Sequence, residues 1–180
     1  SGKTNLLKPL AFLNWFLRDS FRAPANEPIP VRRHFFSEEQ AAEFELVFEA
    51  LESIWRYELK LTSKRVLSEA LYKKTSKYFS YVFRREWQET EKSYVVRQQG
   101  FRFNPIEARK VSERVSLMSA ALQYQVGLAQ KLMDTLAVQT NVHELGRSYM
   151  GHNHVLEASR EYGGDQRMML RMSELLQEWD

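Results

Sequence analysis

Cysteine is absent from this chain of 180 residues. The absence excludes a disulfide framework, thiol catalysis and any metal site that depends on cysteine ligands. It is typical of intracellular proteins, and we predict that location without predicting a compartment. Glycine and proline are also scarce, with seven and five residues. We therefore expect long regular elements with few interruptions.

Long hydrophobic runs are missing as well. The sequence contains no run of apolar residues long enough to predict a transmembrane segment, and its N-terminus has no signal-peptide pattern. The apolar content of 43% and the charged content of 27% are close to globular averages, which argues against disorder. Because the sequence begins with Ser1 and not with methionine, we expect a piece of a larger protein or complex.

The most informative feature that is present is a charge inversion between adjacent segments. Residues 37–59 carry seven glutamates and a single basic residue, Arg56. Residues 60–85 carry eight lysines and arginines and a single acidic residue, Glu69. The net charge of +3 hides this separation. Segments of opposite sign can pair inside one domain, or the basic segment can bind an acidic partner.

Apolar residues recur at spacings of three and four, which predicts an all-α protein, a single bundle of about five helices. The first helix is expected over residues 4–22, followed by a proline-rich connector. We therefore divide the chain into an N-terminal helix with its connector, residues 1–36, and a helical bundle core, residues 37–180.

The core is expected to begin with two helices of opposite charge. A capping box at Ser37–Gln40 predicts the start of the second helix. The third helix is expected from about residue 63 to residue 99, with Gly100 as its terminator. We expect these two helices to pack antiparallel as a hairpin joined near residues 60–63.

A long fourth helix is expected over residues 105–138. Asn104 supplies an N-cap and Pro105 a proline at the first helical position. Residues 115–130 contain no charge, so the sequence predicts that this is the central helix of the bundle. The residues expected to be buried in it are Val115, Met118, Leu122, Val126 and Met133.

The third helix is expected to carry a basic stripe with an aromatic residue in it. Cations around a tyrosine can neutralise phosphates and stack a base. The alternative is a solvated helix face that is partly paired with the acidic second helix. The candidate residues for binding a partner or a polyanion are Lys73, Lys74, Lys77, Tyr81, Arg84 and Arg85.

Two further candidate sites lie near the C-terminus. Three methionines and a tryptophan, Met168, Met169, Met172 and Trp179, predict an adaptable docking face on a last helix, with core packing as the alternative. His143, His152 and His154 have the residue type to hold Zn²⁺, with ordinary loop histidines as the alternative. We assign no metal, no cofactor and no catalytic residue.

The sequence therefore favours a non-enzymatic helical domain for protein–protein interaction or scaffolding, with a protein partner. The first alternative is a domain that binds nucleic acid or an anionic membrane surface through a basic helix at residues 64–85. A second alternative, from a different class, is a metal-dependent enzyme that uses the three histidines. The identity of the partner and the oligomeric state are left open.

Overall fold

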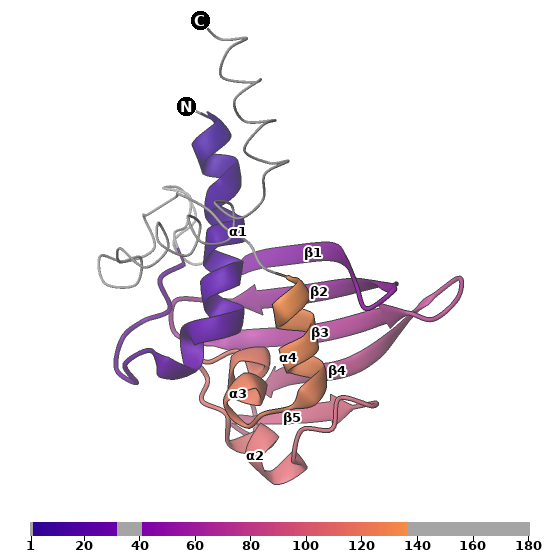
Figure 1. Ribbon diagram of the computed structural model, residues 1–180. Helices are drawn as coiled ribbons and strands as arrows, with labels where there is room; N and C mark the ends of the chain where they lie inside the picture. The colour runs from indigo at the N-terminus through magenta and orange to yellow at the C-terminus, as the bar shows by residue number, and fades with distance from the viewer. Residues whose placement is uncertain (1, 32–40, 137–180) are drawn as a thin grey trace, which may run out of the picture. The chain divides into compact units, whose positions relative to one another are not determined.

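Strands, and not helices, occupy the middle of the chain. The computed structural model describes residues 2–31 and 41–136, all within one unit, residues 1–138. Its sheet is antiparallel, with five strands in the order β1-β2-β3-β4-β5, each paired with the next in sequence (Figure 1). The strands are β1 (Ala42–Ala50), β2 (Ser53–Leu61), β3 (Val66–Lys74), β4 (Phe79–Gln88) and β5 (Ser93–Gln98). The prediction of an all-α bundle is wrong.

The helices of the described residues form a second layer. They are α1 (Gly2–Asp19), α2 (Pro105–Lys110), α3 (Leu117–Gln123) and α4 (Gly127–Thr135), with a short 3₁₀ turn η1 (Ser20–Arg22) after α1. In Figure 1, α1, α3 and α4 lie on one face of the sheet and α2 lies beside its β5 edge. The first helix was expected and is confirmed. The continuous helix over 105–138 is wrong, because non-helical residues separate α2, α3 and α4.

Alternation explains why residues 42–50 form a strand. Glu43, Glu45 and Glu49 are exposed and alternate with less exposed apolar residues, which is the period of a half-buried strand. The same apolar residues also recur at helical spacings, so the pattern is compatible with either element. The turn to β2 consists of Leu51 and Glu52, both with positive φ (50° and 56°). A type I′ hairpin requires this conformation, and Gly or Asn usually supplies it.

The expected pair of long helices is replaced by hairpins. β2 pairs with β3 in antiparallel register, so the acidic and basic segments do lie side by side, but as strands. The segment expected as the third helix is divided among β3, β4 and β5. Gly100, with φ +80°, follows the end of β5 and terminates no helix. The N-cap prediction is confirmed, because the Asn104 side chain accepts hydrogen bonds from the N–H groups of Ile106 and Glu107.

The core lies between the helices and the inner face of the sheet. Phe12 of α1 stacks on Phe44 of β1 with ring centroids 5.1 Å apart. The largest buried apolar side chains come from both layers: Phe16, Leu17, Trp55, Tyr57, Leu61, Leu71, Phe83, Phe101, Leu117, Met118 and Leu132. This packing fixes which face of the sheet is covered and therefore which face is left for contacts.

Burial in α3 and α4 follows the sequence prediction only in part. Met118, Val126 and Met133 are buried, as expected. Val115 and Leu122 are half-buried; Val115 lies in the loop before α3, and Leu122 lies in the last turn of that helix.

Candidate functional site: the open face of the sheet

The predicted basic stripe is split by the sheet and does not form one site. Neighbouring residues on a strand point to opposite faces, so Arg84 is exposed while the adjacent Arg85 has 0% exposure. Lys73 lies on the inner side, with its Nζ 5.5 Å from the ring centroid of Trp55. Lys77 lies in the exposed turn between β3 and β4. Grouping these residues on one helix face was wrong because the element is a strand.

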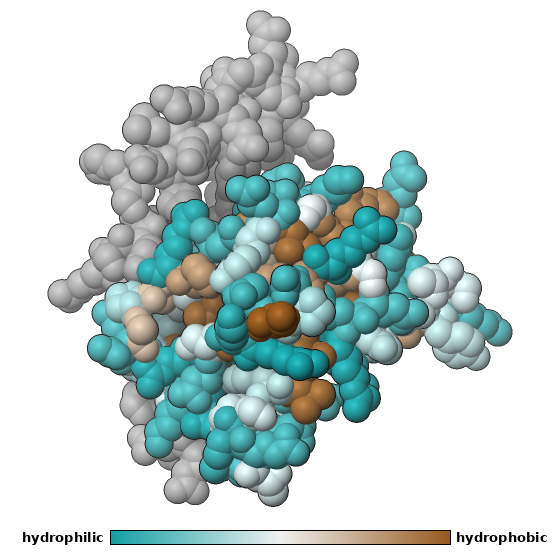
Figure 2. Space-filling model, turned by 90° about the horizontal axis from the view of Figure 1, so that it is seen from below, coloured by the Kyte–Doolittle hydropathy of each residue, from teal (hydrophilic) through white to brown (hydrophobic). Residues whose placement is uncertain are grey.

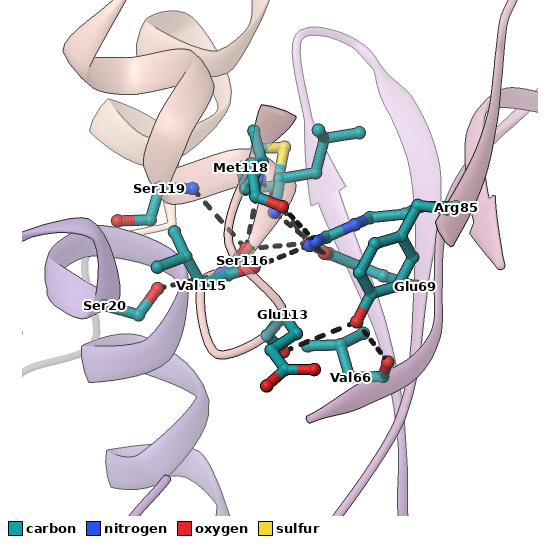
Figure 3. A network of polar contacts seen from close by, with 12 residues as sticks. Ser20, Val66, Glu69, Arg85, Glu113, Val115, Ser116, Met118 and Ser119 are labelled. Atoms are coloured by element: carbon teal, nitrogen blue, oxygen red, sulfur yellow. Dashed lines mark hydrogen bonds and ion pairs between the residues drawn. The ribbon is translucent and has the colours of Figure 1, made fainter. Parts of the chain in front are cut away.

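Arg85 is a buried anchor for the loop between α2 and α3. Its guanidinium donates hydrogen bonds to the carbonyls of Val111 (2.7 Å), Ser112 (2.9 Å) and Val115 (2.7 Å). It lies over the Tyr94 ring, 3.8 Å from the centroid. Burial lowers the pKa of Arg85, and the neighbouring Glu69 carboxylate opposes that shift. The loop is thereby fixed on the inner face of the sheet (Figure 3).

Glu69 anchors the start of α3 in the same network. Its carboxylate is 3.8 Å from the Arg85 guanidinium, and it accepts hydrogen bonds from the Ser116 hydroxyl (2.7 Å) and the Leu117 N–H (2.8 Å). The Tyr57 hydroxyl donates to it at 3.0 Å. Burial, followed by the charge of Glu69, raises the pKa of Tyr57 well above its ordinary value. We interpret this fully buried network as the clamp between the sheet and the helical layer.

Two serines extend the clamp to the N-terminal helix. The Ser116 side chain caps α3, and the backbone N–H of Ser116 donates a hydrogen bond to the Ser20 hydroxyl at 3.0 Å. The Ser119 hydroxyl donates to the Arg18 carbonyl at 3.0 Å. The network thus joins Ser20 of η1, Glu69 of β3, Arg85 of β4 and the start of α3 (Figure 3).

The opposite side of the sheet, which we call the open face, presents charged and aromatic side chains in three cross-strand rows. The strand registers define these rows. The central row is Glu45, Glu58, Ala70, Arg84 and Arg97, from β1 to β5. The lysine row is Glu43, Lys60, Ser68, Glu86 and Val95, and the tyrosine row is Val47, Arg56, Tyr72 and Tyr81.

The central row separates charge across the sheet. Glu45 lies opposite Glu58 on β1 and β2, and Arg84 lies opposite Arg97 on β4 and β5. Like charges directly opposite each other destabilise a sheet. The central row is thus negative on β1 and β2 and positive on β4 and β5, with the small Ala70 at its centre.

Ion pairs within the chain neutralise only part of this charge separation. Arg84 contacts Glu86 at 2.6 Å, and Arg56 contacts Glu58 at 3.1 Å. Among residues 2–31 and 41–136, no ion pair joins Glu45 or Arg97 to another side chain. The two ends of the central row therefore present a negative and a positive charge to solvent.

The tyrosine row adds an aromatic contact. The Arg56 guanidinium lies 4.7 Å from the ring centroids of both Tyr72 and Phe79. Partial burial, followed by the Glu58 charge, raises the pKa of Tyr72. Tyr81 lies opposite Tyr72 in the register and is exposed, as is Val47 at 53%. The open face therefore offers apolar and aromatic surface as well as charge.

A groove lies beside β5, apart from the central row. It has a volume of about 610 Å³ and is bounded by Trp87, Tyr94 and Val96 on one side and by Arg109 and Val111 on the other. Viewed from below, the surface is mainly hydrophilic, with small separate apolar patches (Figure 2). The groove combines charged and apolar walls without a cluster of reactive groups.

The C-terminal candidate sites lie outside the described residues. His143, His152 and His154, and the docking face of Met168, Met169, Met172 and Trp179, all fall in residues 137–180. Within the described ranges, no three histidines or carboxylates are grouped so that they could hold a metal ion. No helix in that part of the chain is long and apolar enough to cross a membrane.

The sequence alone did not identify most residues of the open face, because identifying them requires the strand register. Only Tyr81, Arg84 and Lys74 of the predicted stripe lie on this side of the sheet. The signal that could have indicated it was the alternation of Glu43 and Glu45 with apolar residues. Comparison with known protein families, curated proteins and solved structures finds no match.

Proposed function

We propose that this chain is a protein-interaction domain that contacts its partner through the open face of the sheet. The observation that carries the proposal is the pair of like-charge neighbours in the central row, Glu45 with Glu58 and Arg84 with Arg97. The role agrees with the interaction function expected from the sequence, but the helical surface expected for it is replaced by a sheet.

The energetics favour a partner that carries the opposite arrangement of charges. Each cross-strand pair contributes about 0.2–1 kcal/mol, and the sign is unfavourable for like charges. A partner surface with cations over Glu45 and Glu58 and anions over Arg84 and Arg97 makes the electrostatic contribution of both pairs favourable. Complementary charge also selects the orientation of the complex and raises its rate of association.

Site-specific photo-crosslinking tests this proposal. A photoreactive residue at Val47 or Val95 samples the open face without changing its charges, and one at Lys131 on α4 is the matched control on the helical side. In cells that produce the chain, we expect protein adducts from the two open-face positions and few from Lys131. Equal labelling from all three positions, or no protein adduct from the open face, would refute the proposal.

A polyanion is the second candidate partner, and the basic end of the open face favours it. Arg84 and Arg97 lie together there, and the β3–β4 turn presents Lys77 and Tyr78, the latter 75% exposed. Binding to single-stranded RNA should then weaken with salt, and Arg84→Gln with Arg97→Gln should make the log–log slope shallower by about 1–2. The absence of any complex with RNA homopolymers at low salt would exclude this function.

A further inference from the structure

The geometry points to a second copy of this chain as the partner of the open face. This inference rests on the proposed function and specifies it: two copies pack sheet against sheet as a symmetric dimer. Its basis is that the central row is complementary to itself over its whole length and that the other two rows are complementary at their β2 and β4 positions, while Glu43, paired with Lys60 of its own chain, faces Val95.

The symmetry follows from the order of the strands. A two-fold axis along the central strand β3, within the plane of contact, turns one sheet over and lays it on the other. The operation exchanges β1 with β5 and β2 with β4, and it places β3 against itself. In such an interface the same patch is used by both copies, so complementarity must hold under this exchange.

The central row meets that condition. Under the two-fold operation, Glu45 faces Arg97 of the second copy, and Glu58 faces Arg84 of the second copy. Ala70 faces Ala70 on the axis. The row therefore forms four ion pairs, two from each copy's glutamates, and both like-charge neighbour pairs receive opposite charges.

The other two rows meet it independently at their β2 and β4 positions. In the lysine row, Lys60 faces Glu86 of the second copy, and Ser68 faces itself. In the tyrosine row, Arg56 faces Tyr81 of the second copy, which is a cation–π pairing. Tyr72 faces itself. None of the facing positions on β2 and β4 brings two like charges together.

The dimensions also fit. Face-to-face sheets pack about 10 Å apart with their strands within about 30° of each other. The small residues Ser68 and Ala70 lie on the axis together with Tyr72, and the long Glu and Arg side chains lie away from it. Five strands of about nine residues give a face of roughly 700 Å² per copy, close to the roughly 800 Å² of a standard interface.

Charge reversal with mixing tests the dimer. The first variant carries Glu45→Lys and Glu58→Lys, which makes the central row wholly basic. The second carries Arg84→Glu and Arg97→Glu, which makes it wholly acidic. Sedimentation equilibrium of the full chain should show a dimer whose dissociation constant rises more than about 100-fold in either variant alone. An equimolar mixture of the two variants should again form dimers, because each row then faces its opposite.

The controls separate loss of contact from loss of fold. Lys110→Glu with Lys131→Glu changes two exposed lysines on α2 and α4, outside the three rows, and should leave the dimer intact. Far-ultraviolet circular dichroism should show the same folded spectrum in all variants, whereas the melting temperature of a variant that has lost the dimer should fall toward that of the monomer.

Three results would overturn the inference: a wild-type chain that stays monomeric at high concentration, dimers that persist in both variants, or a mixture that does not associate. A monomer whose Val47 and Val95 probes still crosslink to another protein would leave the proposed function standing and remove only the second copy as its partner.

Discussion

Arg84 and Arg85 are neighbours in sequence, and the structure predicts very different consequences when each is replaced by methionine. Arg85→Met removes the donors for the carbonyls of Val111, Ser112 and Val115, and it leaves Glu69 without its cation. Within one copy, Arg84→Met removes only a solvent-exposed ion pair with Glu86. The two variants have the same chemistry and differ only in the face of β4 on which they lie.

The magnitude follows from burial. Removing one partner of a buried ion pair costs about 3–5 kcal/mol, because the remaining charge stays buried. The total free energy of unfolding of a native domain is about 5–15 kcal/mol, so this loss is a large part of it. For a chain of this size, Arg85→Met should lower the melting temperature by roughly 6–20 °C. In the monomer, at a protein concentration below the dissociation constant of the proposed dimer, Arg84→Met should change the free energy of unfolding by about 0.5 kcal/mol or less. Adding Glu69→Gln to Arg85→Met should cost less than the sum of the two single changes.

Urea unfolding followed by circular dichroism gives these free energies from the midpoint and slope. The expected result is a large shift in midpoint for Arg85→Met and almost none for Arg84→Met. Equal effects of the two substitutions would refute the reasoning, because they would place both arginines in the same environment.

Three further predictions concern the clamp and the core. Ser116→Ala removes the N-cap of α3 and a donor to Glu69, and it should lower the free energy of unfolding by about 0.5–2 kcal/mol in urea titrations. Burial raises the pKa of Tyr94 to about 12, above the value of about 10 in the unfolded chain, so its contribution to stability is complete below pH 10 and is lost as the pH rises toward 12. Tyr94→Phe should therefore flatten the alkaline decline in stability, and an unchanged pH profile would contradict this assignment. Met118→Asp should abolish folding because Met118 is 1% exposed, while Leu122→Asp, at a half-buried position, should give a folded protein with a lower melting temperature.

The sequence predicted the start of α2 correctly, whereas the expected terminator Gly100 follows a strand and the capping box Ser37–Gln40 lies outside the described residues. Asn104 and Pro105 define the start of α2 as expected, because an N-cap depends only on local chemistry. Residues 42–50 satisfy both helical and strand periodicities, and glutamate and leucine favour helices. What decides between them is pairing with β2 and packing against α1, which are long-range contacts that local patterns do not contain.

Local sequence patterns did not indicate two breaks in the chain, the β1–β2 turn and the break between α2 and α3, for the same reason. Leu51 and Glu52 adopt positive φ without a glycine or asparagine to mark the hairpin. The break between α2 and α3 depends on Arg85, which lies in a distant strand and binds the loop carbonyls. Because the sequence does not mark the breaks among α2, α3 and α4, the apolar spacing of residues 105–138 predicts one continuous helix.

The sequence indicated the charged segments that form the candidate site but not how their side chains are arranged. The inversion between residues 37–59 and 60–85 supplies Glu45, Glu58 and Arg84 of the central row, and Arg97 lies beyond both segments. Which cations reach the open face is decided by strand alternation, which sends Arg84 outward and Arg85 inward. The complementarity of Glu58 with Arg84 appears only once the register is known.

Distances between two spin labels test the sheet-to-sheet dimer most directly, because the chain has no cysteine of its own. Ser68→Cys places a single label on the two-fold axis, and Val95→Cys places one in the same row, two strands away. Strands about 4.8 Å apart and sheets about 10 Å apart predict backbone separations of about 10 Å for Ser68 and about 22 Å for Val95. A label at Lys131 on the helical side should give a much longer distance. Dipolar electron paramagnetic resonance that finds this order, Ser68 shortest and Lys131 longest, supports the open face as the interface, and a Lys131 distance shorter than that of Ser68 would contradict it.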